Sequence, residues 1–293
     1  MNHNYVIVTD ATADLPPAQV RELGIDVVPM TFCIDGNEWT HHPDSEHQSS
    51  CAFLDALRTG KRMITSQVNE MTYQAVFTSH LEAGRDILYI GFSSGLSGMY
   101  QGAVRAAKEL NERFAPNQVV LVDSLCASVG QGLLVSQAAH RQREGWKIHR
   151  LERWLGENCR AVSHWFRVED LMHLKRGGRI SPAAAAMGTA LQVKPILTTD
   201  SDGRLQTVGK IRGRKKSLNH LADQLSARYN PELCADVWIC HVEARDEARQ
   251  LKEMLIARHG LNEIPVLPVG PIIGAHTGPG MVGLVFFGQD RGE

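Results

Sequence analysis

The first half of the chain alternates short apolar runs with segments of helical periodicity, and this alternation limits the folds available to it. Four runs are predicted strands: 5–8, 25–32, 87–91 and 119–122. Helices are predicted between and after them, at 16–23, at 69–83, around 100–110 and up to residue 144. Continuous apolar strands separated by helices are typical of a parallel sheet that is covered on both faces. We therefore expect a three-layer α/β/α arrangement.

The second half follows a different pattern. The segments 196–199 and 205–211 flank Ser-Asp-Gly, which is a hairpin signal and implies antiparallel pairing. Other predicted elements are strands at 161–168, 235–242, 266–269 and 281–287, and helices at 182–191, 215–228 and 246–259. At roughly 150 residues per domain, 293 residues suggest two domains. We expect a parallel α/β domain over 1–160 and a two-layer α/β domain with a mixed sheet over 161–293.

Charge and cysteine usage exclude several classes of protein. The 31 basic and 32 acidic residues give a formal charge of −1, which argues against general nucleic-acid binding. The six cysteines are scattered without a C-x-x-C pair, which predicts reduced thiols and no metal site. The first apolar run is too short for a signal peptide, and the weakly charged stretch 265–287 is rich in proline and glycine. We expect a cytoplasmic protein with no membrane span.

Hydroxyl side chains follow the predicted strands. Thr65 and Ser66 come after one short apolar run, and Ser93 and Ser94 come after another. Ligands of parallel α/β sheets bind at the carboxyl ends of the strands, where hydroxyls and free backbone N–H groups suit an anion. Any one of these hydroxyls is more readily explained as a helix cap. The two loops together favour an anion site.

Residues 91–95 also fit G-x-S-x-G, the nucleophile motif of α/β-hydrolases. Such an enzyme would use Ser93 as nucleophile and His276 as base. Helical spacing resumes only after Ser97, and no oxyanion loop of the H-G-G-G type precedes the motif, so a serine hydrolase is the alternative reading. His276 itself lies between glycines and prolines in a predicted C-terminal loop, 270–280, where an imidazole is able to donate to a carboxylate.

Two basic segments stand out, at 175–179 and 210–216. Each is either a solvated face or a surface for phosphate or an acidic partner. A nucleic-acid or regulatory binder acting through 210–216 is a third reading, which the net charge disfavours.

Taken together, the motifs resemble those of the DegV family over nearly the whole chain. They are VTDATADLP (8–16), TSQ (65–67), IGFSSGLSGMYQGA (90–103), VDSLCASVGQG (122–132), DLMHLKRGGRIS (170–181), VKPIL (193–197), DGRL (202–205), KIRGRKKSL (210–218) and IGAHTGPG (273–280). The resemblance implies the two-domain DegV fold with a long-chain fatty acid bound between the domains as ligand. It implies a lipid-binding protein rather than an enzyme, one that presents the carboxylate to a fatty acid kinase. The acyl phosphate so formed feeds phospholipid synthesis.

The resemblance also assigns residues. Thr65 and Ser93 are expected to bind the carboxylate, Ser94 to support them and His276 to complete the polar network. The segment with Arg212 and Lys215 corresponds to the kinase-docking and phosphate region.

The acyl chain is expected against apolar residues of the second domain. The candidate wall is Met187, Leu191, Val193, Ile196 and Leu197. Two departures from the family pattern are Ala11 in place of Ser and Val68-Asn69 in place of Pro followed by Ser or Thr. The second departure leaves the path of the loop after Gln67 open.

Overall fold

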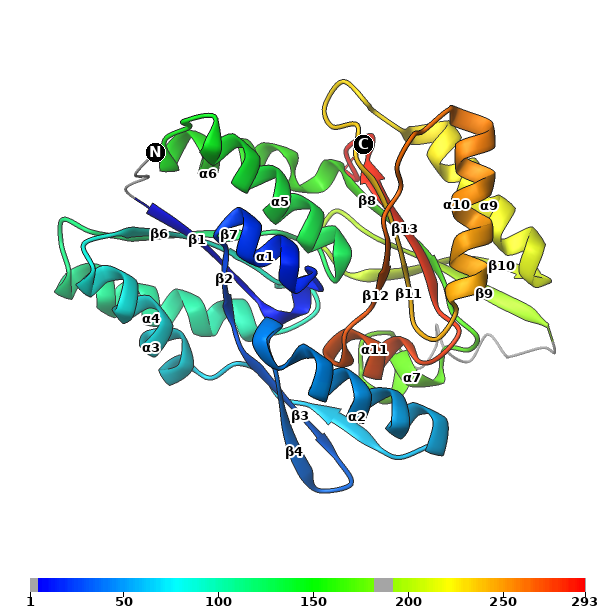
Figure 1. The fold of residues 1–293 in the computed structure, drawn as a ribbon, viewed down its shortest axis with the longest axis horizontal. Helices are drawn as coiled ribbons and strands as arrows, with labels where there is room; N and C mark the ends of the chain where they lie inside the picture. The colour runs from blue at the N-terminus through cyan, green and yellow to red at the C-terminus, as the bar shows by residue number, and fades with distance from the viewer. Residues whose placement is uncertain (1–4, 182–191, 293) are drawn as a thin grey trace.

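The computed structural model describes residues 5–181 and 192–292. The first half forms a parallel sheet of order β2-β1-β6-β7. Its strands are β1 (Tyr5–Asp10), β2 (Asp26–Val28), β6 (Asp86–Gly91) and β7 (Val119–Asp123). The helices around it are α1 (Pro17–Leu23), α3 (Glu70–Glu82), α4 (Met99–Arg113), α5 (Val129–Arg143) and α6 (Ile148–Asn158). Helices α3 and α4 cover one face of this sheet, and α1, α5 and α6 cover the other (Figure 1).

The second half forms a mixed sheet of order β10-β9-β8-β13-β11-β12, in which only β11 and β12 pair in parallel. Its strands are β8 (Val162–Arg167), β9 (Val193–Thr199), β10 (Leu205–Arg212), β11 (Val237–His241), β12 (Val266–Pro268) and β13 (Val282–Phe287). Helices α9 (Arg214–Arg228) and α10 (Arg245–His259) pack on one face. The predicted fold class is confirmed. The boundary at 160/161 falls in the short 3-10 helix Cys159–Ala161 and stays a prediction.

The single strand predicted over 25–32 is wrong. Its first part is β2, and its second part is β3 (Met30–Ile34) in a separate antiparallel sheet of order β4-β3-β5, with β4 (Asn37–His41) and β5 (Met63–Thr65). Pro29, which has no N–H to donate to a ladder, stands between them. Helix α2 (Glu46–Thr59), preceded by the 3-10 turn Pro43–Ser45, was not predicted. The helix predicted over 182–191 lies outside the described residues.

The loop predicted over 270–280 is also wrong in part, because α11 (Pro271–Thr277) occupies most of it. Pro271 stands at the first position of this helix, where its fixed φ and missing N–H are tolerated. Helix α11 packs against the short helix α7 (Met172–Arg176) and against α2 and β5. The glycines and prolines thus build a short helix that carries His276 toward β5.

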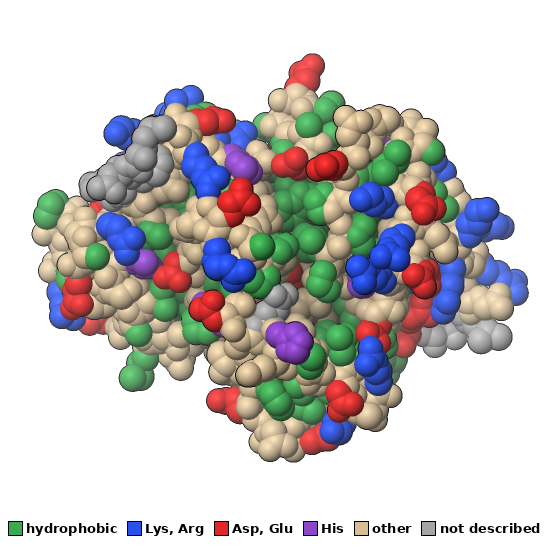
Figure 2. All heavy atoms as spheres, viewed as in Figure 1, with side chains coloured by type: hydrophobic (Ala, Val, Ile, Leu, Met, Phe, Trp, Pro, Cys, Tyr) green, Lys and Arg blue, Asp and Glu red, His purple; other side chains and the backbone are tan. Residues whose placement is uncertain are grey.

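One hydrophobic cluster joins the two sheets. It contains side chains of the parallel sheet, of α5 and of the inward face of the mixed sheet, among them Ile7, Leu133 and Val285. Helix α5 contacts β1 and β6 on one side and β8, β11 and β13 on the other. A second cluster lies between the mixed sheet and α9 and α10. Figure 2 shows hydrophobic side chains in the hollow between the parts built on the two sheets.

Candidate functional site

Two neighbouring cavities meet beside α11. The first is an apolar cavity of about 70 Å³ between the loop after β6, the start of α5, α11 and the inward face of the mixed sheet. Apolar side chains that line it include Phe92, Leu96, Phe166, Leu174, Leu205, Ile273, Met281 and Val285. The second is a cleft of about 680 Å³ formed by the end of α2, β5, α7 and α11. Among the described residues, Arg179 and His276 line both.

Thr65 and His276 contact each other at this junction. Thr65 is the last residue of β5, and its Oγ1 lies 2.8 Å from Nε2 of His276 on α11. The backbone of Gly177 packs against the imidazole, where an added Cβ would lie 2.2 Å from Nδ1. Burial, with the positive fields of Arg179 and His173, lowers the pKa of His276 to about 4. A neutral imidazole beside a hydroxyl supplies donors for a carboxylate without adding a charge.

Arg179 supplies the positive charge at the junction, and sequence reasoning placed it only in a basic segment. Its guanidinium is half-buried and donates through Nη1 to the carbonyl of Gly177. Burial lowers the pKa of Arg179, but a guanidinium stays protonated in proteins. The remaining donors of its planar fork match the geometry of a carboxylate or a phosphate. In the sequence, the Gly-Gly pair before Arg179 was the feature that indicated a turn, and in the structure this turn brings the chain back toward α11.

Ser93 and Ser94 are not part of the Thr65–His276 contact. Ser93 is fully buried, and its Oγ donates to the carbonyl of Gly203 in the β9–β10 hairpin at 2.9 Å. Ser94 is exposed, and its backbone N–H donates to Asp123 at 3.2 Å. A serine hydrolase needs its base within hydrogen-bond reach of the nucleophile, whereas His276 contacts Thr65 and Ser93 contacts a carbonyl. The geometry therefore does not favour the hydrolase alternative.

Asp10 holds the loop that carries Ser93, and sequence reasoning assigned it no such role. Its carboxylate is fully buried and accepts from Phe92 N at 3.0 Å, from the Tyr89 hydroxyl at 2.9 Å and from Gln131 Nε2 at 3.3 Å. The backbone N–H and hydroxyl of Thr12 also donate to it. Burial raises the pKa of Asp10, while these hydrogen bonds oppose the rise. The first strand thus ends in an anchor for the loop after β6.

The residues predicted to line the acyl chain do not lie together. Met187 and Leu191 lie outside the described residues. Leu197 is buried in the cluster that joins the two sheets, whereas Ile196 is buried on the opposite face of the mixed sheet, against α9 and α10. Val193 is half-buried at the start of β9. None of these last three lines the apolar cavity, because the side chains that reach it from β9 and β10 are Thr199 and Leu205.

The predicted partner surface lies at the far end of β10. Arg212 ends that strand and Lys215 lies in the first turn of α9, and both side chains are exposed. Between them, Arg214 approaches Glu247 at 3.4 Å. Basic side chains are visible over the part of Figure 2 where α9 and α10 lie.

The loop after Gln67 follows a defined path despite its departure from the family pattern. Val68 is buried, and Asn69 caps α3 by accepting from the backbone N–H of Thr72 at 2.9 Å. Asparagine is among the residues preferred at a helix N-cap, so Asn69 suits this position. Ala11, the other departure, is buried in the 3-10 turn Ala11–Ala13 after β1.

Within residues 5–181 and 192–292, no three His, Cys, Asp or Glu side chains gather as they would around a metal ion. None of the helices there has both the length and the apolar composition that crossing a bilayer requires.

The chain is similar to known proteins along almost its whole length. The model of the family described as "Uncharacterised protein, DegV family" matches residues 4–289. A DegV domain-containing protein of Clostridium perfringens is 38% identical over 287 residues, which cover 98% of each chain.

Two solved structures share the fold along almost their full lengths. A DegV lipid binding protein from Thermotoga maritima has a TM-score of 0.83 and 26% identity, with 98% of this chain and 99% of the other covered. A DegV family protein from Thermus thermophilus, described by its fatty acid binding, has a TM-score of 0.83 and 29% identity, with 97% and 99% covered. The match along nearly the whole sequence, together with the shared fold, shows that this chain belongs to the DegV family.

Proposed function

We propose that this protein binds a long-chain fatty acid, with the carboxylate at Thr65, His276 and Arg179 and the acyl chain in the apolar cavity. The observation that carries the proposal is the junction itself: Arg179 and His276 line both the polar cleft and the apolar cavity. The chemical character of the two linings matches a molecule with one anionic end and one long apolar end. In this reading the ligand lies between the predicted domains 1–160 and 161–293.

The relatives and elementary energetics support the proposal. The structural neighbours from Thermotoga maritima and Thermus thermophilus are described as lipid-binding and fatty-acid-binding proteins. Each methylene removed from water contributes roughly 0.8 kcal/mol. An acyl chain of palmitate length therefore supplies on the order of 10 kcal/mol before the costs of association are subtracted. Such a ligand would remain bound through purification.

The first experiment is mass spectrometry of the purified protein, under native conditions and after extraction with organic solvent. We expect a stoichiometric adduct that extracts as a fatty acid of defined chain length. A protein that carries no adduct and fails to bind added palmitate or oleate would refute the proposal.

Head-group recognition is tested by comparing palmitate with hexadecanol, which has the same chain but no carboxylate. Thr65→Val and Arg179→Met should weaken palmitate binding and leave hexadecanol binding nearly unchanged. Loss of one charge-assisted hydrogen bond predicts about a tenfold weaker affinity for palmitate. Thr59→Val, an exposed position on α2, is the matched control for the hydroxyl change. Equal losses for acid and alcohol would place the carboxylate elsewhere.

We further propose that the bound carboxylate is presented to a partner kinase, which forms the acyl phosphate. The proposal rests on the family resemblance and on the exposed cations Arg212 and Lys215. Loaded protein, ATP and a cognate kinase should form acyl phosphate, and the double change Arg212→Ala with Lys215→Ala should slow that reaction without changing palmitate affinity. Lys108→Ala, exposed on α4, is the control. Persistent inactivity of the loaded protein would end this proposal.

A further inference from the structure

Asp14 joins the starts of two helices that enclose the apolar cavity. Its Oδ2 accepts from the Ser128 hydroxyl at 2.5 Å, at the N-cap of α5, and its Oδ1 accepts from the backbone N–H of Gly270 at 3.0 Å, at the N-cap of α11. The residue itself follows the 3-10 turn after β1 and holds a left-handed backbone, with φ of 49°. Asparagine and aspartate tolerate that conformation better than other residues with a side chain.

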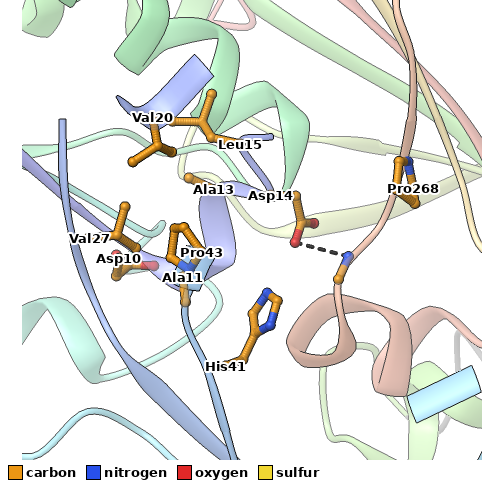
Figure 3. A pocket seen from close by; sticks show the side chains of 11 residues that line it. Asp10, Ala11, Ala13, Asp14, Leu15, Val20, Val27, His41, Pro43 and Pro268 are labelled. Atoms are coloured by element: carbon orange, nitrogen blue, oxygen red, sulfur yellow. Dashed lines mark hydrogen bonds between the residues drawn. The ribbon is translucent and has the colours of Figure 1, made fainter. Parts of the chain in front are cut away.

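The contact with Gly270 is closely packed. A Cβ added to Gly270 would lie 2.5 Å from Asp14 Oδ1 and 2.9 Å from Nε2 of His41. Figure 3 shows the Asp14 carboxylate directed at the backbone that begins α11, beside His41 and a cavity of about 30 Å³. The ring of His41 is fixed in turn, since its Nδ1 lies 2.8 Å from the Ser49 hydroxyl. The start of α11 is therefore closely packed against the side chains of Asp14 and His41.

The geometry points to Asp14 as a positioning residue for the head-group site, one that sets the direction of α11 and so holds the His276 imidazole against Thr65. This inference rests on the proposed function. Helix α11 has seven residues, too few to be stable without tertiary contacts. Its orientation therefore depends on what holds its ends, and Asp14 holds the end opposite His276. A carboxylate also interacts favourably with the positive N-terminal end of a helix.

The test compares Asp14→Ala with Asp14→Asn and with Asp35→Ala. The amide of Asn keeps an oxygen that accepts from Gly270 N–H, so Asp14→Asn should keep both the palmitate affinity and the His276 titration of the wild type. Asp35 is an exposed aspartate with nearly the same backbone, φ of 48°, so its alanine variant carries the same backbone cost without the helix contact. The readouts are affinity for palmitate, affinity for hexadecanol and the NMR titration of the His276 imidazole, assigned with His276→Gln.

We expect Asp14→Ala to weaken palmitate binding by about tenfold or more and hexadecanol binding by much less. We also expect the pKa of His276 to move from about 4 toward its ordinary value, because the ring is released from its buried position between Arg179, His173 and Thr65. Asp14→Asn and Asp35→Ala should stay within about threefold of the wild-type affinity.

Two outcomes would overturn the inference: an unchanged His276 titration in Asp14→Ala, or equal losses for palmitate and hexadecanol. If Asp14→Ala does not fold, Gly270→Ala takes its place, because the added methyl group displaces the same carboxylate. If the wild type binds neither ligand, the fatty-acid proposal fails separately. The titration of His276 in the ligand-free protein then still decides whether Asp14 positions it.

Discussion

Replacing Arg291 by alanine should destabilise the protein through loss of contacts between its two halves. The guanidinium donates to the carbonyls of Leu125 and Cys159 through Nη2, both at 3.0 Å. Through Nη1 it donates to Thr199 Oγ1 at 2.6 Å and to the carbonyl of Asp200 at 3.0 Å, and through Nε to the carbonyl of Arg160 at 3.1 Å. One planar group thus links the segments before α5 and after α6 to the β9–β10 hairpin.

The expected magnitude follows from these bonds. Each carbonyl that loses a charged donor in a half-buried place costs about 1–3 kcal/mol, and water reaches the contacts nearest the surface. We therefore expect Arg291→Ala to lower the free energy of unfolding by about 3–5 kcal/mol. Arg291→Lys should lose most of this as well, because an ammonium cannot span five acceptors as a planar fork does.

Urea denaturation followed by circular dichroism measures the change, with Arg249→Ala, exposed on α10, as the control. A loss below about 1 kcal/mol for Arg291→Ala would refute the reasoning, since that is the range of a single solvated hydrogen bond. A lysine variant as stable as the wild type would refute the argument from fork geometry.

Three further predictions concern buried polar groups. Glu247→Ala leaves the fully buried Arg167 short of a partner and should cost about 3 kcal/mol in urea denaturation; a loss near zero would show that Glu169 suffices. Burial lowers the pKa of His41 to about 4, whereas in the unfolded chain its pKa is about 6.5. As the pH falls from 6.5 to 4, the unfolded chain is therefore protonated before the folded one, and the free energy of unfolding should fall by up to about 1.4 kcal/mol per pH unit. His41→Asn should flatten that decline in acid denaturation series. Tyr89→Phe removes the hydroxyl bond to the buried aspartate that ends β1 and should cost about 1–2 kcal/mol, whereas an unchanged midpoint would contradict the role of that bond.

Much of the fold was predictable because fully buried parallel strands leave a simple trace in the sequence. Strand β1 is buried at every position, and the apolar run 5–8 predicted it, although the strand extends through Asp10. The run 25–32 was less uniformly apolar and belongs to two sheets, and β3 buries every second residue around Phe32. The chain passes from one sheet to another at Pro29, and this change depends on tertiary packing, which the spacing of apolar residues does not reveal.

The candidate site was predictable only in part. Thr65 and His276 are 211 positions apart, and only the family resemblance brought them together in advance. Arg179 looked like one cation among several in a basic segment, because the turn that buries it depends on packing against α11. No local pattern around Asp14 predicted that its carboxylate contacts the starts of both α5 and α11.

The double packing of α5 bears on how a ligand enters. Eleven of the fifteen residues of this helix are buried, and it contacts both sheets at once. A hinge that swung the two sheets apart would strip α5 from one of them and expose a large apolar area to water, at a cost of about 25 cal/mol for each Å². Local opening of the short helix α7, which borders both cavities and buries only Leu174, exposes far less. An acyl chain is therefore expected to enter beside α7, while both sheets stay packed against α5.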